Sequence, residues 1–318
     1  IVFVTHVGDI VQRGNHQAEW DKADQAMGVL DGVVPYSMLP GNHDWNVTGD
    51  KTSGVGRYID TFGPQRFDRE RWFGGASDNQ LNTYQVFEAG GTEFLHLAIE
   101  WHPTVWPAGQ ASPLIWAQSV IDAHPNTPTI VTTHENVDNS PPGRSSRGEA
   151  FWQQFVRDNN QVFLVLSGHF CSPSTGSIAG NYHQTSVNAA GNDVHEVLQD
   201  YQCLPNGGNG YLRLIEFDLD AQIMRFQTYS PPLDLFQAST VAEVGQLAGD
   251  FELPLDLHTR FRCSRDDLNA DGVLDGNDTV LFVQSVERGD RDADLNRDRS
   301  WDMFDVLEFL RRVDAACP

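Results

Sequence analysis

The stretch MLPGNHDWN, residues 38–46, ends an apolar run with Pro-Gly and then places three polar groups in a row. They are the amide of Asn42, the imidazole of His43 and the carboxylate of Asp44. Pro, Gly, Asn and Asp all favour turns, so a plain surface turn explains this stretch taken alone. A ligand-binding loop at the end of a buried strand explains it equally well, and the rest of the chain must decide.

Other apolar runs end in the same way. The four runs of this kind are IVFVTHVGD (1–9), VVPYSMLPG (33–41), PTIVTTHEN (128–136) and QVFLVLSGH (161–169). Continuous apolar runs are typical of strands that are buried on both faces. Helix-like spacing of apolar residues marks three segments between them: 17–31, 112–124 and 147–159. The sequence therefore predicts an α/β core, which an antiparallel hairpin extends over residues 211–231.

Each of these runs ends at a side chain that can bind a metal: Asp9, Asn42, His134 and His169. In an open α/β sheet, ligands gather beyond the carboxyl ends of the strands. The ligand set would consist of one carboxylate, one amide oxygen and two imidazoles. Such a mixed set suits Mn, Fe or Zn better than the Cys-rich ligand set of a structural zinc site would. One or two such divalent ions can hold a phosphate and activate water. The sequence thus predicts a catalytic transition-metal site.

The blocks also resemble, in their order, those of the calcineurin-like metallophosphoesterases. The resemblance covers residues 1–232 and rests on GDIV (8–11), GNHD (41–44), TTHEN around His134, and Gly-His at 168–169. It implies a four-layer α/β/β/α sandwich that hydrolyses phosphate mono- or diesters or nucleotides with metal-activated water. The same resemblance makes Asp9, Asn42, His134 and His169 the metal ligands. His43 would face the phosphoryl group, and Asp44 would orient His43.

The chain departs from that family pattern in two places. The first block, Asp-x-His, is missing because nothing precedes Ile1, so we read residue 1 as the edge of a fragment that has lost its leader. In GHFC, Cys171 replaces the second His of the last block. Three roles stay open for Cys171: a thiolate ligand, a disulfide partner of Cys203, which we favour, or a packing residue. The alternative to an enzyme is a degenerate, non-catalytic phosphoesterase fold that binds a surface or a carbohydrate.

The last part of the chain contains two acidic repeats, offset by 27 residues. Both have oxygen ligands at the spacing of an EF-hand loop. The first repeat provides Asp267, Asn269, Asp271, Val273, Asp275 and Asp278. The second provides Asp294, Asn296, Asp298, Ser300, Asp302 and Asp305. Because Arg299 stands where this loop prefers glycine, we expect the second loop to bind Ca²⁺ less tightly.

Each acidic loop precedes an amphipathic segment, and paired units of this kind resemble a dockerin module. The resemblance covers residues 263–318 and implies a small all-α, calcium-binding domain that docks onto a cohesin-like or cell-surface protein. We therefore expect three parts: a phosphoesterase domain over residues 1–232, a connecting segment over 233–262, and the dockerin-like domain over 263–318.

The amino-acid composition limits the binding partners and the cellular location that we expect. A net charge of -23 argues against binding to a nucleic-acid duplex, whose backbone carries the same sign. No apolar run approaches the roughly 20 residues of a membrane span. The four cysteines, an even number with two of them bordering the acidic module, favour disulfides and an extracellular or cell-surface location. Buried free thiols in a cytosolic protein are the alternative.

Overall fold

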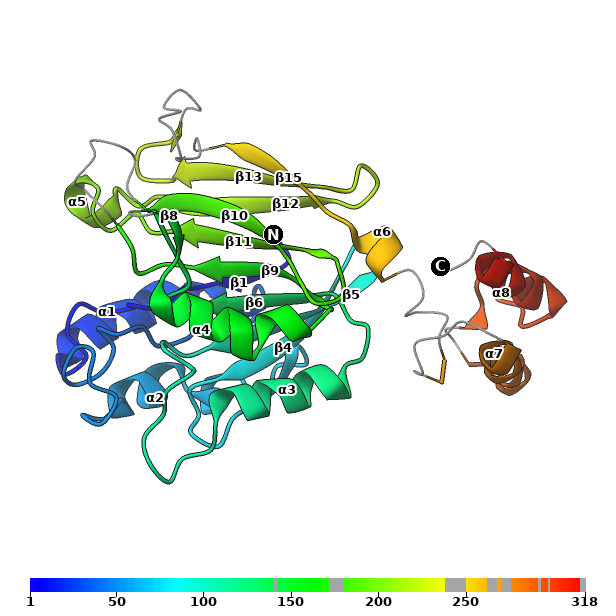
Figure 1. Ribbon diagram of the computed structural model, residues 1–318, viewed down its shortest axis with the longest axis horizontal. Coiled ribbons are helices and arrows are strands. Elements are labelled where there is room, and N and C mark those ends of the chain that lie inside the picture. The colour runs from blue at the N-terminus through cyan, green and yellow to red at the C-terminus, as the bar shows by residue number, and fades with distance from the viewer. Residues whose placement is uncertain are drawn as a thin grey trace. The chain divides into compact units, whose positions relative to one another are not determined.

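A computed structural model of the 318-residue chain describes residues 1–139, 142–171, 180–237, 250–261, 268–269, 276–290, 293–296 and 298–314. The chain divides into two compact units (Figure 1). The first consists of residues 1–124 and 128–255, and the second of residues 125–127 and 256–318. No helix in the described ranges has both the length and the apolar character that crossing a bilayer requires.

A seven-stranded mixed sheet forms the centre of the first unit, in the order β10-β11-β9-β6-β5-β4-β3. Strands β5, β6, β9 and β11 run parallel to one another, and the strands at both edges are antiparallel. Their bounds are β3 Phe73–Ala76, β4 Thr83–Ala89, β5 Thr92–Ile99, β6 Thr129–Thr133, β9 Val162–Ser167, β10 Asn181–Val187 and β11 Asp193–Gln199. Every residue of β6 and β9 is buried, which confirms two of the predicted strands.

Two helices cover one face of this sheet (Figure 1). Helix α3 spans Pro113–Ala123 and helix α4 spans Ser146–Gln154, as their apolar spacing predicts. Each begins at a serine whose side chain accepts a backbone N–H of the first turn, a standard N-cap. Their apolar faces pack on the sheet in one buried cluster, which includes Leu97, Leu114, Ala117, Val131, Phe151 and Trp152.

A second, antiparallel sheet packs on the opposite face. Its strands are β12 Leu212–Asp218, β13 Ile223–Ser230, β14 Leu235–Phe236 and β15 Phe251–Pro254. The ring of Phe217 on β12 lies 5.8 Å from Phe94 on β5 and 5.9 Å from Phe163 on β9. The predicted hairpin is confirmed as β12 and β13. Strands β14 and β15 fall within the expected connecting segment, because strands this short leave no readable periodicity and are fixed by pairing with β13.

Smaller elements complete the first unit. Strand β1 (Val4–Thr5) pairs in parallel with β2 (Tyr36–Ser37), and β7 (Val137–Asn139) pairs with β8 (Pro142–Arg144). The helices are α1 Gln17–Met27, α2 Gly56–Phe62 and α5 Pro205–Gly208, with 3₁₀ turns at Gly28–Leu30, Pro64–Arg66 and Val156–Asp158. A second apolar cluster joins α1 and α2 to the segment after β2, and includes Trp20, Met38, Tyr58 and Phe62.

In the second unit, α6 spans Leu257–Arg260, α7 spans Gly276–Arg288 and α8 spans Met303–Asp314. The rings of Phe282 and Phe309 stack at 4.3 Å and join α7 to α8. These two helices confirm the amphipathic segments. From β10 onward the C-terminal region as a whole is mostly sheet plus these two helices and is not all-α; the all-α domain was expected over residues 263–318 alone, where the described elements are α7 and α8.

Candidate metal centre

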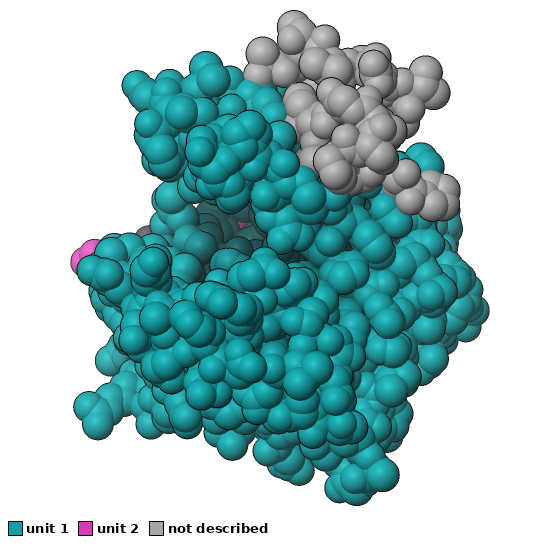
Figure 2. All heavy atoms as spheres, turned by 90° about the vertical axis from the view of Figure 1, so that its left-hand side faces the viewer, with its two compact units in different colours: residues 1–124, 128–255 teal, residues 125–127, 256–318 magenta. Residues whose placement is uncertain are grey.

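The four predicted metal ligands lie together in the structure, although they come from distant segments. Asp9 follows β1, Asn42 follows β2, His134 follows β6 and His169 follows β9. In Figure 1 the arrowheads of β9 and β11 point to the left-hand side, and Figure 2 shows that the surface of the first unit is hollowed on that side. The ligand atoms of Asp9, His134 and His169 all lie within 4.8 Å of one another.

His134 is at the centre of the cluster. Its Nε2 lies 2.9 Å from Oδ1 of Asn42, 3.2 Å from Oδ2 of Asp9 and 3.1 Å from Nδ1 of His169. Its other ring nitrogen, Nδ1, is 2.7 Å from the carbonyl oxygen of Val7 and donates to it. In the neutral ring Nε2 therefore carries a lone pair that faces other acceptor atoms. Convergence of these four groups on one point fits a bound cation, and this mixed oxygen and nitrogen set suits Mn, Fe or Zn.

The pKa values of these ligands are shifted by burial and by one another. Burial alone would lower the pKa of His134, but the hydrogen bond and charge of Asp9 hold it above its ordinary value. Burial would raise the pKa of Asp9, and the hydrogen bond and charge of His134 hold it below its ordinary value. Burial, with the charge of His134, lowers the pKa of His169 to about 4. His169 is thus neutral at pH 7 and able to bind a metal.

Two of the ligand residues have a strained backbone. Asp9 (φ 54°) and His169 (φ 73°) both have left-handed backbone conformations, which non-glycine residues rarely adopt. The loops that carry Asp9 and Asn42 also touch closely, because a Cβ on Gly41 would collide with the backbone and carboxylate of Asp9. The glycines of both motifs therefore allow the ligand loops to meet.

Asp44 has a different role from the one we expected. Its buried carboxylate accepts the backbone N–H groups of Ile10 (3.2 Å), Val11 (3.0 Å) and Gly41 (2.7 Å). Burial, reinforced by the charge of Asp9, raises the pKa of Asp44 to about 7. The expected Asp44–His43 pair is not formed, because the carboxylate is turned inward to join the two ligand loops.

His43 is oriented by Gln12 instead. Its Nδ1 lies 2.9 Å from the carbonyl oxygen of Gln12 and 3.1 Å from the side-chain amide of the same residue. Its backbone N–H donates to Oδ1 of Asp9 at 2.8 Å. Sequence reasoning missed Gln12, although its position directly after the GDIV block, three residues after Asp9, was a usable signal.

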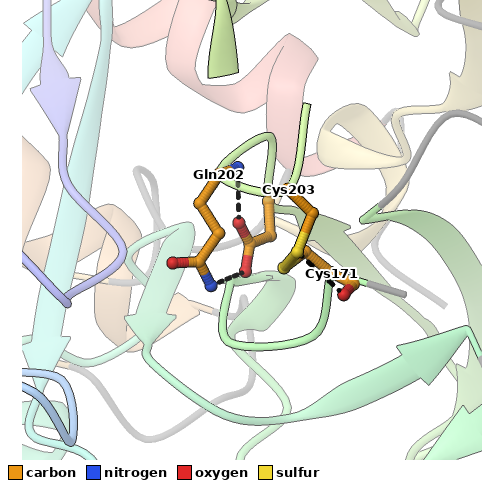
Figure 3. The surroundings of a disulfide bond; sticks show 4 residues. Cys171, Gln202 and Cys203 are labelled. Atoms are coloured by element: carbon orange, nitrogen blue, oxygen red, sulfur yellow. Dashed lines mark hydrogen bonds between the residues drawn. A yellow bond between two sulfur atoms is a disulfide. The ribbon is translucent and has the colours of Figure 1, made fainter. Parts of the chain in front are cut away.

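A disulfide lies close to the last ligand. Figure 3 shows the bond between Cys171 and Cys203, whose Cα atoms are 5.6 Å apart, with Gln202 beside it. It confirms the disulfide among the three roles considered for Cys171. Gln202 donates its backbone N–H and its side-chain amide to the buried carboxylate of Asp200, at 3.0 and 2.9 Å. Cys263 and Cys317 lie outside the described residues.

The acidic repeats lie in the second unit. Of the first repeat, Asp267, Asp271, Val273 and Asp275 lie outside the described residues, whereas Asn269 and Asp278 lie within them. The second repeat is described at all six predicted positions. Both repeats share one contact: Oδ1 of Asp278 accepts the backbone N–H groups of residues 268 and 269, and Oδ1 of Asp305 those of residues 295 and 296. The repeat is therefore structural as well as sequential.

Comparison with known proteins identifies the first unit. Residues 1–173 match the calcineurin-like phosphoesterase family. The chain is also homologous to "Uncharacterized protein YvnB" of Bacillus subtilis (strain 168), with 32% identity over 266 residues. That match covers 82% of this chain but 19% of YvnB, so the chain spans about a fifth of its relative's length. The family match ends before residue 263, and the dockerin resemblance stays a prediction. With more than half of its length matched, the chain belongs to the calcineurin-like phosphoesterase family.

Proposed function

We propose that the chain is a metal-dependent phosphoesterase that hydrolyses phosphate mono- or diesters, or nucleotides. The observation that carries the proposal is the convergence of Asp9, Asn42 and His169 on Nε2 of His134, at 2.9 to 3.2 Å. A carboxylate, an amide oxygen and two imidazoles from four loops form a ligand set that a divalent cation would complete. When bound there, a divalent ion polarises the phosphoryl group and makes water a better nucleophile.

The remaining chemistry comes from residues around the ligands. The carbonyl of Gln12 is placed to accept the Nδ1 proton of His43, so in the doubly protonated ring Nε2 carries the proton that the leaving oxygen of the substrate would receive. Asp44 acts indirectly, because it ties the Asp9 and Asn42 loops together through their backbone N–H groups. His43 is therefore the proposed acid, and Asp44 supports the geometry of the site.

We also propose the finer features that the sequence suggests. The helix layer and the two facing sheets support the four-layer sandwich, and the disulfide supports an extracellular or cell-surface location. The ligand spacing of the two acidic repeats is the basis for proposing two Ca²⁺ loops, and these loops would serve a docking module over residues 263–318. Its partner would be a cohesin-like or cell-surface protein.

Hydrolysis of bis(p-nitrophenyl) phosphate tests the proposed reaction. Chelation should stop hydrolysis by the 318-residue chain, and Mn²⁺ or Zn²⁺ should restore it. Asn42→Ala should prevent this recovery, whereas Asn15→Ala, a matched change at an exposed turn, should not. Hydrolysis that withstands both chelation and Asn42→Ala would contradict the proposal. So would the lack of any phosphoesterase activity in the metal-loaded chain, which would favour the non-catalytic alternative.

A further inference from the structure

Glu135 is a buried carboxylate beside the metal centre that the proposed reaction does not use. It is 4% exposed and follows the ligand His134 at the end of β6. Its Oε2 accepts hydrogen bonds from Nη1 of Arg147 (2.7 Å) and from the indole N–H of Trp101 (3.0 Å). Its Oε1 accepts a bond from the hydroxyl of Ser145 at 2.9 Å. Three donors thus hold this carboxylate in one orientation.

That orientation brings Glu135 to a metal ligand. Its Oε2 lies 3.8 Å from Nε2 of His169, while Nδ1 of His169 faces the cluster, 3.1 Å from Nε2 of His134. The two ring nitrogens of His169 therefore point to different partners. If Nδ1 holds the metal, Nε2 carries the proton and faces the carboxylate.

His134 shows the same arrangement in a completed form. Its Nε2 faces the cluster, and its Nδ1 donates to the carbonyl of Val7 at 2.7 Å. A histidine that binds a metal commonly donates its other N–H to a carboxylate or a carbonyl, which fixes the ring and strengthens the ligand. Val7 provides that acceptor for His134, and Glu135 occupies the corresponding place for His169.

We propose that Glu135 is a positioning residue that orients His169 for metal binding, and that Arg147 and Trp101 keep its carboxylate directed at the ring. Backbone conformation alone does not fix this ring, since His169 has a left-handed φ of 73° and is partly exposed. The inference rests on the proposed metal site and adds residues from the ends of β5 and β6 and from the start of α4 to it.

Calorimetric titration of Mn²⁺ into the metal-free chain tests the inference. Glu135→Gln should weaken binding by about 10- to 100-fold, the usual cost of losing such a partner. Glu149→Gln is the matched control, because Glu149 lies on the same helix as Arg147 and also accepts a hydrogen bond from an arginine, Arg144 of β8. It should bind Mn²⁺ as the unaltered chain does. The thermal midpoints of the metal-free variants show whether both fold.

Arg147→Gln separates positioning from simple charge attraction. Removal of a positive charge near a cation site would tighten Mn²⁺ binding if charge alone mattered. If Arg147 positions Glu135, binding should weaken instead, and the visible spectrum of bound Co²⁺ should change with the ligand geometry. Unchanged affinity in Glu135→Gln, or tighter binding in Arg147→Gln, would overturn the inference. Failure of the unaltered chain to bind Mn²⁺ would instead refute the metal site on which the inference rests.

Discussion

The metal centre and the second acidic loop both gather side chains that can bind a metal, but they assemble them in opposite ways. At the metal centre, Asp9, His134 and His169 come from loops far apart in the chain, and their acceptor atoms face one another. In the loop of residues 294–305, the carboxylates accept N–H groups of the same loop. Asp294 accepts those of Asp298 and Arg299, at 3.1 and 2.9 Å.

This difference shows what each region needs from a cation. The acidic loop can satisfy many of its acceptors with its own backbone, so its shape depends less on an ion. The metal centre relies on the folded sheet to hold its acceptors together, and a cation is the natural partner for them. Catalysis should therefore respond to changes at the metal centre and not to changes in the loop.

The largest expected effect is the loss of hydrolysis in His169→Ala. Without this imidazole the centre loses a neutral nitrogen ligand, and phosphodiester hydrolysis should fall to the rate without enzyme. The paired change Asp298→Ala removes a predicted ligand of the acidic loop and should leave hydrolysis unchanged. Initial rates with saturating Mn²⁺ measure both. Equal losses in the two variants would remove the distinction between the regions.

His43→Ala should have the next largest effect. Loss of a positioned acid lowers kcat by roughly 10²–10⁴-fold. Because the ring of His43 contacts Gln12 and no ligand side chain, Mn²⁺ affinity should be unaffected. Steady-state kinetics measures the loss in kcat, and calorimetry on the same preparation measures the Mn²⁺ affinity. A parallel loss of Mn²⁺ affinity would show that His43 is itself a ligand.

The acidic loop should respond only to its own substitutions. Trp301 lies within it, so energy transfer from this indole should excite Tb³⁺ bound in place of Ca²⁺. Asp298→Ala should weaken Tb³⁺ binding by about tenfold, through loss of a charged ligand. Arg299→Gly should strengthen binding, because Arg299 has a left-handed φ of 67° that glycine adopts without strain. Luminescence that is insensitive to both changes would reject the calcium loop, whereas His169→Ala should not affect it.

Acid should weaken the central sheet through a buried neutral histidine. His96 on β5 lies between Gln85 and Thr132, at 2.8 Å from each, and burial lowers its pKa to about 3. Between pH 6.5 and 3 the unfolded chain binds the extra proton, so stability falls as pH falls. This site should account for about 1 kcal/mol between pH 6.5 and 5.5.

Urea unfolding of the metal-free chain measures that loss. His96→Leu should have a shallower pH dependence over this interval, whatever its absolute stability. The same measurement on His124→Leu, which removes a histidine at the C-terminus of α3, shows how much the slope changes when a histidine outside the sheet is lost. An identical slope in His96→Leu would show that other groups carry the acid sensitivity.

The sequence predicted the parts of the site that are set by strand ends. Asn42, His134 and His169 follow buried runs whose apolar residues identify them as strands, and the parallel order of β6 and β9 then brings the two histidines together. The helices α3 and α4 were predicted because their apolar spacing is regular over several turns. These features depend on local patterns that a single sequence displays.

Contacts between loops could not be predicted in this way. Asp44 binds backbone N–H groups from a loop more than 30 residues away, and no sequence pattern specifies such a contact. Glu135 meets Trp101 and Arg147 only because β5, β6 and α4 end near one another. Strand β15 exists because it pairs with β13, which its four residues do not indicate.

Diffraction from crystals soaked in Mn²⁺ tests the central claim most directly. An anomalous peak should lie among Oδ2 of Asp9, Oδ1 of Asn42, Nε2 of His134 and Nδ1 of His169, and it should disappear in His169→Ala crystals. A peak confined to the acidic loop of residues 294–305, with none among these four side chains at saturating Mn²⁺, would contradict the account.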